Sequence, residues 1–231
     1  MAPTKTSQPG GLTRLLTTIA IVLGVFAPVV MLIERNLESF YVFKMDELHD
    51  LAQRGIRAHG NDTGAIVSYI VGELAERHPL HVNAHSHGDA DEWMFNNAGG
   101  AMGGMYLIHA SITEYLIIFG TAVGTEGHTG RHTADDYFHI LAGEQWAYTP
   151  GAYAPEVFPA GSVHHLRRGT VKQYKMPEAC FALEYARGWI PPMLFFGFAD
   201  GLSSTLDLPT LWRTTYITGR EMLGNLALGK L

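Results

Sequence analysis

The chain has 231 residues, 47% of them hydrophobic and only 16% charged, and its formal net charge is -6. Because an ordinary soluble domain is about 25% charged, we expect part of this chain to face lipid or an apolar cavity. The sequence has no run of Lys and Arg to neutralise phosphates, which excludes nucleic acid as a partner. The length suits one domain with an anchor. Cys180 is the only cysteine, so an internal disulfide and the common cysteine-based zinc signatures are excluded.

The N-terminal part of the chain predicts a membrane anchor. After a tail of residues 1–14, residues 15–33 carry no charge, and at about 1.5 Å per residue they reach roughly the thickness of a bilayer core. A cleaved signal peptide is the alternative, but this run is long for one and no small-residue cleavage site follows. Lys5 and Arg14 precede the run, whereas Arg35 is offset by acids, which favours a luminal domain.

Residues 34–105 are predicted to form a helical connector. Apolar residues recur at helical spacing in its first part, at Val42, Met45, Leu48 and Leu51. Asp62 or Thr63 can cap a second helix, which must end before Pro79. The small residues of 92–105 recur every four positions, which predicts a tightly packed core helix or, equally, a contact between subunits.

Residues 106–190 change to short β-type runs separated by Gly or Pro. The clearest strand is 115–119, and further strands are predicted at 136–141, 156–158, 162–166, 170–174 and 180–185. Many short strands at this spacing indicate an antiparallel sandwich or barrel.

Residues 191–231 become apolar again after a pair of prolines. The run 193–202 is too short to span a bilayer, and Asp207 can cap a last helix with a basic polar face. These two helices could simply cover the β-domain. Beside an anchor, however, we expect them to lie in the membrane interface.

Two motifs in the β-region are typical of a cupin-like jelly-roll barrel. Residues 159–164 have the form of the second cupin motif, which ends on His164. Counting back from Gly143 puts Asp136 at the Glu position of the first motif and His132 near its second His. Because the motifs occur in the right order, the predicted class is mainly β with flanking helices.

Strand alternation predicts which acids face the interior. Asp136 lies on the same face as Phe138 and Ile140, and Asp135 then faces outward. On a later strand, Glu184 is a single acid in an apolar run, where an acid must be paired or neutralised.

Two inward carboxyl groups in an apolar cavity predict acid–base chemistry on a lipidic substrate. Burial and mutual repulsion raise one pKa, so that one group keeps its proton near neutral pH while the other acts as a base. The apolar lining suits a substrate without charged groups. A salt bridge between Glu184 and Arg187 is the structural alternative.

A metal site is a further alternative. One candidate cluster comprises His85, His87, Asp89, Asp91 and Glu92, but it precedes the β-region and is better interpreted as a solvated loop. A second candidate set, in register with the predicted barrel, comprises His132, Asp136 and His164. It would make the chain a metal-dependent cupin enzyme.

Four long segments of the sequence resemble those of the fungal C-8 sterol isomerases, a family that also includes the animal sigma non-opioid receptor. The segments are 97–104, 109–131, 181–191 and 203–214. The resemblance implies an isomerase that moves a delta-8 double bond to delta-7 in a sterol such as fecosterol, in ergosterol synthesis at the endoplasmic reticulum. It implies no cofactor and no metal, a single membrane span, binding of lipophilic cationic amines, and trimers. A sigma-like receptor without turnover is the alternative.

The resemblance also assigns roles to residues. It implies that Glu184 and Asp136 are jointly catalytic, although the receptor's second acid falls where this chain has Phe138. That difference leaves Asp135 open as the alternative partner. Glu114 is expected to be structural. The residues expected to contact substrate are Tyr115, Phe138, Ile140, His164, Phe181 and Tyr185.

Overall fold

The computed structural model describes residues 10–231, which divide into two compact units: the residues up to Phe40, and Tyr41–Leu231. In the first unit, α1 (Gly11–Arg35) is followed by a short 3-10 helix, Leu37–Phe40. Among the described residues, α1 is the one helix long and apolar enough to cross a membrane, by length and composition alone. The predicted apolar helix is therefore confirmed. Residues 1–9 of the predicted tail lie outside the described part.

The second unit begins with a pair of helices, α2 (Met45–His59) and α3 (Thr63–Arg77). The chain reverses between them at Gly60, whose φ of 59° suits a residue without a side chain. The Asp62 side chain then accepts a hydrogen bond from the backbone N–H of Ala65 at 3.0 Å, so the predicted cap is confirmed.

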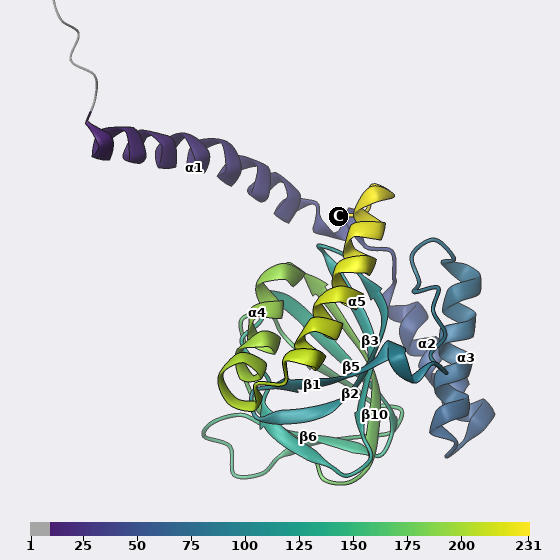
Figure 1. The fold of residues 1–231 in the computed structure, drawn as a ribbon. Helices are drawn as coiled ribbons and strands as arrows, with labels where there is room; N and C mark the ends of the chain where they lie inside the picture. The colour runs from purple at the N-terminus through teal and green to yellow at the C-terminus, as the bar shows by residue number, and fades with distance from the viewer. Residues whose placement is uncertain (1–9) are drawn as a thin grey trace, which may run out of the picture. The chain divides into compact units, whose positions relative to one another are not determined.

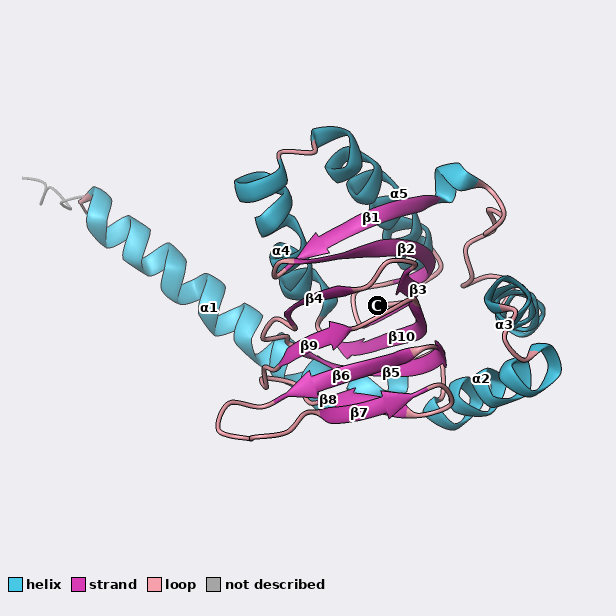
Figure 2. Ribbon diagram, turned by 90° about the horizontal axis from the view of Figure 1, so that it is seen from below, coloured by secondary structure: helices cyan, strands magenta, loops and turns pink. Residues whose placement is uncertain are grey.

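The rest of this unit is built on two antiparallel sheets that lie face to face (Figure 2). In spatial order the larger sheet comprises β1 (Trp93–Ala98), β2 (Ala101–Ala110), β3 (Glu114–Thr121), β10 (Cys180–Gly188), β5 (Ala134–Ala142) and β8 (Val163–Leu166). The smaller sheet comprises β4 (Thr125–His128), β9 (Gln173–Met176), β6 (Glu144–Tyr148) and β7 (Glu156–Pro159). The mainly β class with flanking helices is confirmed.

The predicted helix at 92–105 is wrong. After a 3-10 turn at Ala90–Glu92, these residues form the hairpin of β1 and β2, so the helical connector ends earlier than residue 105. Gly99 and Gly100 make its turn with φ values of 65° and 85°, which favour glycine. A side chain at Gly103 would come within 2.7 Å of the Gly120 carbonyl oxygen on β3. The small residues therefore serve a turn and a close approach of strands.

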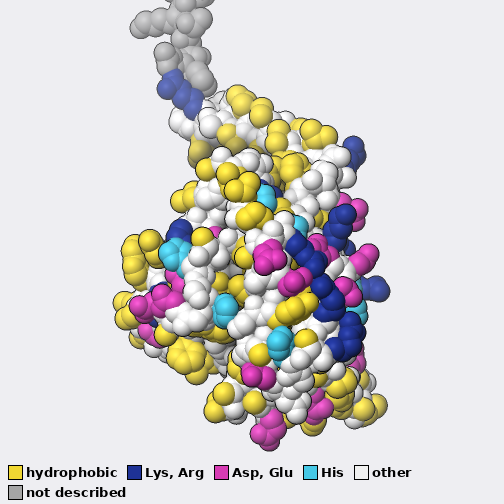
Figure 3. Space-filling model, turned by 90° about the vertical axis from the view of Figure 1, so that its right-hand side faces the viewer, with side chains coloured by type: hydrophobic (Ala, Val, Ile, Leu, Met, Phe, Trp, Pro, Cys, Tyr) yellow, Lys and Arg dark blue, Asp and Glu magenta, His cyan; other side chains and the backbone are white. Residues whose placement is uncertain are grey.

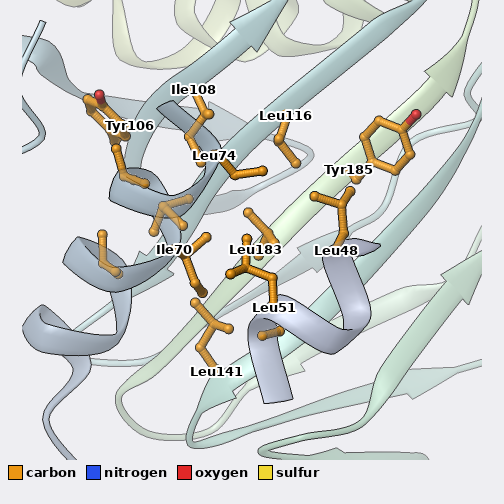
Figure 4. Close-up of a cluster of buried hydrophobic side chains, with 14 of the residues drawn as sticks. Leu48, Leu51, Ile70, Leu74, Tyr106, Ile108, Leu116, Leu141, Leu183 and Tyr185 are labelled. Carbon is orange, nitrogen blue, oxygen red and sulfur yellow. The ribbon is translucent and has the colours of Figure 1, made fainter. Parts of the chain in front are cut away.

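The helices α2 and α3 cover one face of the larger sheet through a shared hydrophobic core (Figure 4). Leucine and isoleucine side chains from both helices meet residues of β2, β3, β5 and β10, and these include Leu48, Leu51, Ile70, Leu74, Ile108, Leu116, Leu141, Leu183 and Tyr185. The outer side of the helices carries intermingled acids and bases (Figure 3), among them the ion pair of Arg77 with Glu73 at 2.7 Å. The charged outer side of these two helices is therefore suited to contact with water.

The last helices, α4 (Ile190–Asp200) and α5 (Leu208–Ala227), pack against β1 and β2 (Figure 1) and are joined by a π-helical turn, Gly201–Thr205. The Asp207 side chain accepts from the N–H of Thr210 at 3.2 Å, which confirms this predicted cap as well. Unlike α2 and α3, these helices and the connection between them expose large apolar side chains, among them Phe195, Leu202, Leu206, Leu208, Trp212 and Leu223.

Candidate active site

The inner face of the larger sheet brings two acids together. Asp136 on β5 is opposite Ala186 on β10, and Glu184 is opposite Phe138, so the acids are diagonal neighbours on one face. Long side chains reach each other across such a diagonal. Asp136 is 1% exposed. Asp135 points the other way and accepts from the Nε2 of His165 at 2.8 Å, as alternation predicted.

A cavity opens in front of this pair, between the two sheets and the last helices. The space among its lining atoms is about 1210 Å³, which includes space open to solvent. Its lining is mostly apolar and includes Phe95, Met105, Tyr115, Ile117, Phe119, Phe138, Met193, Leu194 and Phe196. Such a surface accepts a bulky, uncharged hydrocarbon.

The two carboxyl groups hold a proton between them. Burial first, and then the nearby charge of Asp136 and a side-chain hydrogen bond with it, raise the pKa of Glu184 well above its usual range. Burial also raises the pKa of Asp136 to about 7. Two adjacent buried acids cannot both ionise near neutral pH, so at least one stays protonated.

The salt bridge between Glu184 and Arg187, the structural alternative from the sequence, does not form. Arg187 lies three positions later and therefore on the opposite face of β10. Its guanidinium stacks over the rings of Tyr137 and Tyr41, with centroid distances of 5.3 and 5.6 Å. Glu184 is left facing the cavity and its acid neighbour.

The residues expected to contact substrate lie at different depths. Tyr115 and Phe138 line the cavity. Ile140 is on the same inner face but is packed in the core cluster between the sheets. His164 is also buried, with its ring stacked 4.4 Å from Phe158 and its Nδ1 2.6 Å from the Oε1 of Gln145.

Phe181 and Tyr185, which were expected to contact substrate, do not line this cavity. Both occupy odd positions of β10, and the inward direction of Glu184 places odd positions on the outer face. Their side chains belong to the core under α2 and α3. The Tyr185 hydroxyl donates to the Oε1 of Glu114 at 2.7 Å.

Glu114 is fully buried on that outer face and is surrounded by donors. The backbone N–H groups of Val42 and Phe43 donate to its two oxygens at 2.7 and 3.1 Å. The Lys230 ammonium lies 2.8 Å from its Oε2, and the Tyr185 hydroxyl supplies a fourth donor. Glu114 thus ties the chain before α2 and the end of the chain to β3.

Comparison with known proteins places the chain in a family. A family model described as "ERG2 and Sigma1 receptor like protein" matches residues 20–230. The chain belongs to this family. A protein of Gibberella zeae named C-8 sterol isomerase ERG2 is 68% identical over 222 residues, which cover 96% of this chain and 92% of that protein. The C-8 sterol isomerase of Pyricularia oryzae is 72% identical over 92% of this chain and 95% of its own length.

Receptors are more distant relatives, and the matched solved structures include cupins. The sigma non-opioid intracellular receptor 1 of Xenopus tropicalis is 39% identical over 79% of this chain and 80% of its own length. Among solved structures, an RmlC-like cupin from Shewanella frigidimarina matches 49% of this chain and 98% of its own, with 14% identity and a TM-score of 0.40.

The candidate metal ligands of this family member do not converge. Among the described residues, no group of three or more His, Cys, Asp or Glu side chains is placed to hold a metal ion. The Nε2 of His132 is instead bonded to the carbonyl oxygen of Thr129 at 2.6 Å. In the loop before β1, the Nε2 of His87 lies 2.9 Å from the Ser68 hydroxyl.

Several lining residues were not identified from the sequence. Phe95 lay in the segment predicted as a helix, and Met193 and Leu194 lay in a segment assigned to membrane contact. Tyr174 on β9 also lines the cavity, whereas the sequence predicts it only as the last residue of a strand and gives it no role. Its alternation with polar neighbours, in the run 173–176, was the one signal that could have identified it.

Proposed function

We propose that this chain is a sterol isomerase that moves a ring double bond from delta-8 to delta-7. The observation that carries the proposal is the buried pair of Glu184 and Asp136, two adjacent acids with raised pKa values at the wall of an apolar cavity. The high identity to proteins named C-8 sterol isomerase supports the same reaction.

The chemistry needs an acid and a base on one substrate. The protonated carboxyl gives its proton to carbon 9 through the π electrons of the double bond, which leaves a tertiary cation at carbon 8. Loss of a proton from carbon 7 then forms the new double bond. The pair supplies both groups, and its negative charge stabilises the cation at the apolar wall of the cavity.

The roles of the two acids are assigned jointly. Glu184 and Asp136 share their proton, so the acid and the base are properties of the pair. Asp135 faces His165 on the outer side and is not proposed to take part. Tyr115 and Phe138 are proposed to contact the rings of the substrate.

The surroundings of the cavity support access from a membrane. We propose that α1 anchors the protein in the endoplasmic reticulum as a single span, with the catalytic unit on the luminal side. The apolar side chains of α4 and α5 then contact lipid, and the two sheets close as a cupin-like barrel around the sterol. A trimer is proposed from the resemblance to the receptor.

A receptor without turnover is the second candidate, favoured by the 39% identity to the sigma receptor. Both functions predict binding of lipophilic amines, since an ammonium resembles the cation at carbon 8 and pairs with the carboxylates. Binding alone therefore does not distinguish them.

The deciding experiment is turnover by the purified full-length protein in detergent or vesicles. We expect conversion of a delta-8 sterol to its delta-7 isomer, and undiminished conversion after treatment with a chelator. Amine binding without conversion would replace the isomerase with the receptor. Conversion that stops on chelation and returns with added metal would support the metal-dependent enzyme. In cells lacking their own isomerase, accumulated delta-8 sterols should disappear when this chain is expressed.

A further inference from the structure

Tyr174 lies on the wall of the cavity that faces the carboxyl pair. It belongs to β9, in the middle of the smaller sheet, whereas Glu184 and Asp136 belong to the larger sheet. Its partners on the adjacent strands are Gly127 and Ala147, which bear a hydrogen atom and a methyl group. The phenol ring therefore projects between the sheets without a bulky neighbour on either side.

The hydroxyl of Tyr174 is available for a hydrogen bond. Within the described residues it has no partner, whereas Tyr115 shares a hydrogen bond with the Thr218 hydroxyl at 3.3 Å and Tyr185 donates to Glu114. Burial, followed by the charges of Glu184 and Asp136, raises the pKa of Tyr174, so the phenol keeps its proton. The hydroxyl is thus a donor within electrostatic reach of both acids.

We propose that Tyr174 is a positioning residue that acts through the carboxyl pair, by donating a hydrogen bond to it once the pair has given its proton to the substrate. This inference rests on the proposed isomerase function. In that step the carboxyl O–H bond breaks, a C–H bond forms at carbon 9, and the pair gains a second negative charge. The phenol keeps its own proton throughout. A hydrogen bond to an ionised acceptor is about twice as strong as a neutral one.

The other titratable groups around the cavity are engaged elsewhere. Besides the bonded Tyr115, the lining includes His128, His132 and Asp207. His128 accepts from the N–H of Gly130, His132 is bonded to Thr129, and Asp207 caps α5. From α4 the cavity receives only uncharged residues, and Asp135 acts on Asp136 from the outer face by charge alone. Among these groups, Tyr174 is the donor that can respond to the second charge.

The first test compares the wild-type protein with Tyr174→Phe, which removes only the hydroxyl. We expect kcat to fall roughly ten- to a hundredfold, the loss of one hydrogen bond to a charged group, with KM changed less than about threefold. Without the donor the doubly ionised pair is less stable, so the alkaline limb of the pH profile should move to higher pH. Tyr148→Phe, at an exposed position of β6, is the matched control. It should leave kcat and the alkaline limb of the pH profile unchanged.

The second test measures the ionisation of the carboxyl pair directly, without substrate conversion. Infrared spectroscopy of the protonated-carboxyl band during a pH titration should show ionisation at higher pH in Tyr174→Phe. Fluorotyrosine at position 174 is a stronger donor of nearly the same shape, and it should move the ionisation of the carboxyl pair to lower pH. An unchanged band in both variants overturns the inference. Absence of sterol conversion by the wild-type protein overturns the proposed function instead, while the band still reports on Tyr174.

Discussion

Two buried acid sites lie on opposite faces of the same sheet, and their surroundings differ in kind. Glu114 on β3 faces α2 and α3 and is met by two backbone N–H groups, a tyrosine hydroxyl and the ammonium of Lys230. Glu184 on β10 faces the cavity and meets another acid, Asp136. Every charge at the first site is compensated, whereas the second site gains from holding a proton.

This difference separates a structural carboxylate from a reactive one. A carboxylate that meets four donors is held in place by its hydrogen bonds and its ion pair, and its role is to join segments of the chain. An acid beside a second acid in an apolar wall keeps its proton near neutral pH and can release it to a substrate. Burial alone is common to both sites, and the identity of the neighbours decides the chemistry.

The largest effect should come from Glu184→Gln. The amide keeps the shape but cannot transfer a proton, so we expect kcat to fall on the order of 10²- to 10⁴-fold, the usual contribution of acid–base catalysis. The unfolding temperature at neutral pH should not fall, because an ionisable group has left an apolar site. Near-normal turnover, or loss of folding, would refute the distinction between the two acids.

Glu114→Gln should show the opposite pattern. It removes the carboxylate that lies against the Lys230 ammonium, whose side chain is 6% exposed, and breaking such a buried ion pair costs about 3–5 kcal/mol of unfolding free energy. The fraction that remains folded should keep a near-normal kcat. Denaturant unfolding measures the loss, and the double variant Glu114→Gln/Lys230→Met should recover part of it. If the double variant recovers nothing, the ion pair is not the source.

Substituting Asp136 and Asp135 in turn compares an acid that faces the cavity with an acid on the outer face of the same strand. Asp136→Asn should lower kcat about 10²-fold or more, within the range of acid–base groups. Asp135→Asn alters partly exposed contacts with His165 and with the backbone N–H of Arg168, of which the ion pair is worth less than about 1 kcal/mol, and should leave turnover nearly unchanged. Parallel assays of the two variants decide whether alternation has identified the partner of Glu184.

The pH dependence of stability should show the smallest effect. The folded pKa of Asp136 is raised to about 7 and that of Glu184 is raised further above its ordinary value, so their contribution is full below about pH 4 and is lost as pH rises through the folded values. Between about pH 6 and pH 9, the unfolding temperature should therefore fall less steeply with pH in Glu184→Gln than in the wild-type protein.

Below about pH 4 the stability profiles of the variant and the wild-type protein should run parallel, because the contribution of the acid pair is constant there. Burial lowers the pKa of His109, His139 and His164 to about 4, so their contribution is present above about 6.5 and is lost as pH falls. A difference in slope between the two proteins that is confined to pH values below about 4 would mean that the acid pair does not carry a raised pKa.

Local patterns predicted the parts of the molecule that depend on neighbours in the sequence. The apolar run of α1, the caps at Asp62 and Asp207, most strands and the inward face of Asp136 all follow from periods of 3.6 or 2 residues and from capping chemistry. The same rules failed at 92–105, where glycines that suit a close helix contact also suit a hairpin turn. Local spacing does not distinguish the two.

The sequence by itself determined that one acid of β5 and one acid of β10 face an apolar interior, because alternation fixes the face of each side chain. Only the tertiary structure decided that these two strands are adjacent, with a register that makes Glu184 and Asp136 diagonal neighbours. It also decided that Tyr174 faces them from the other sheet and that Tyr185 serves Glu114. Which strands pair, and which sheets face each other, depends on contacts between distant segments, and no local period encodes those contacts.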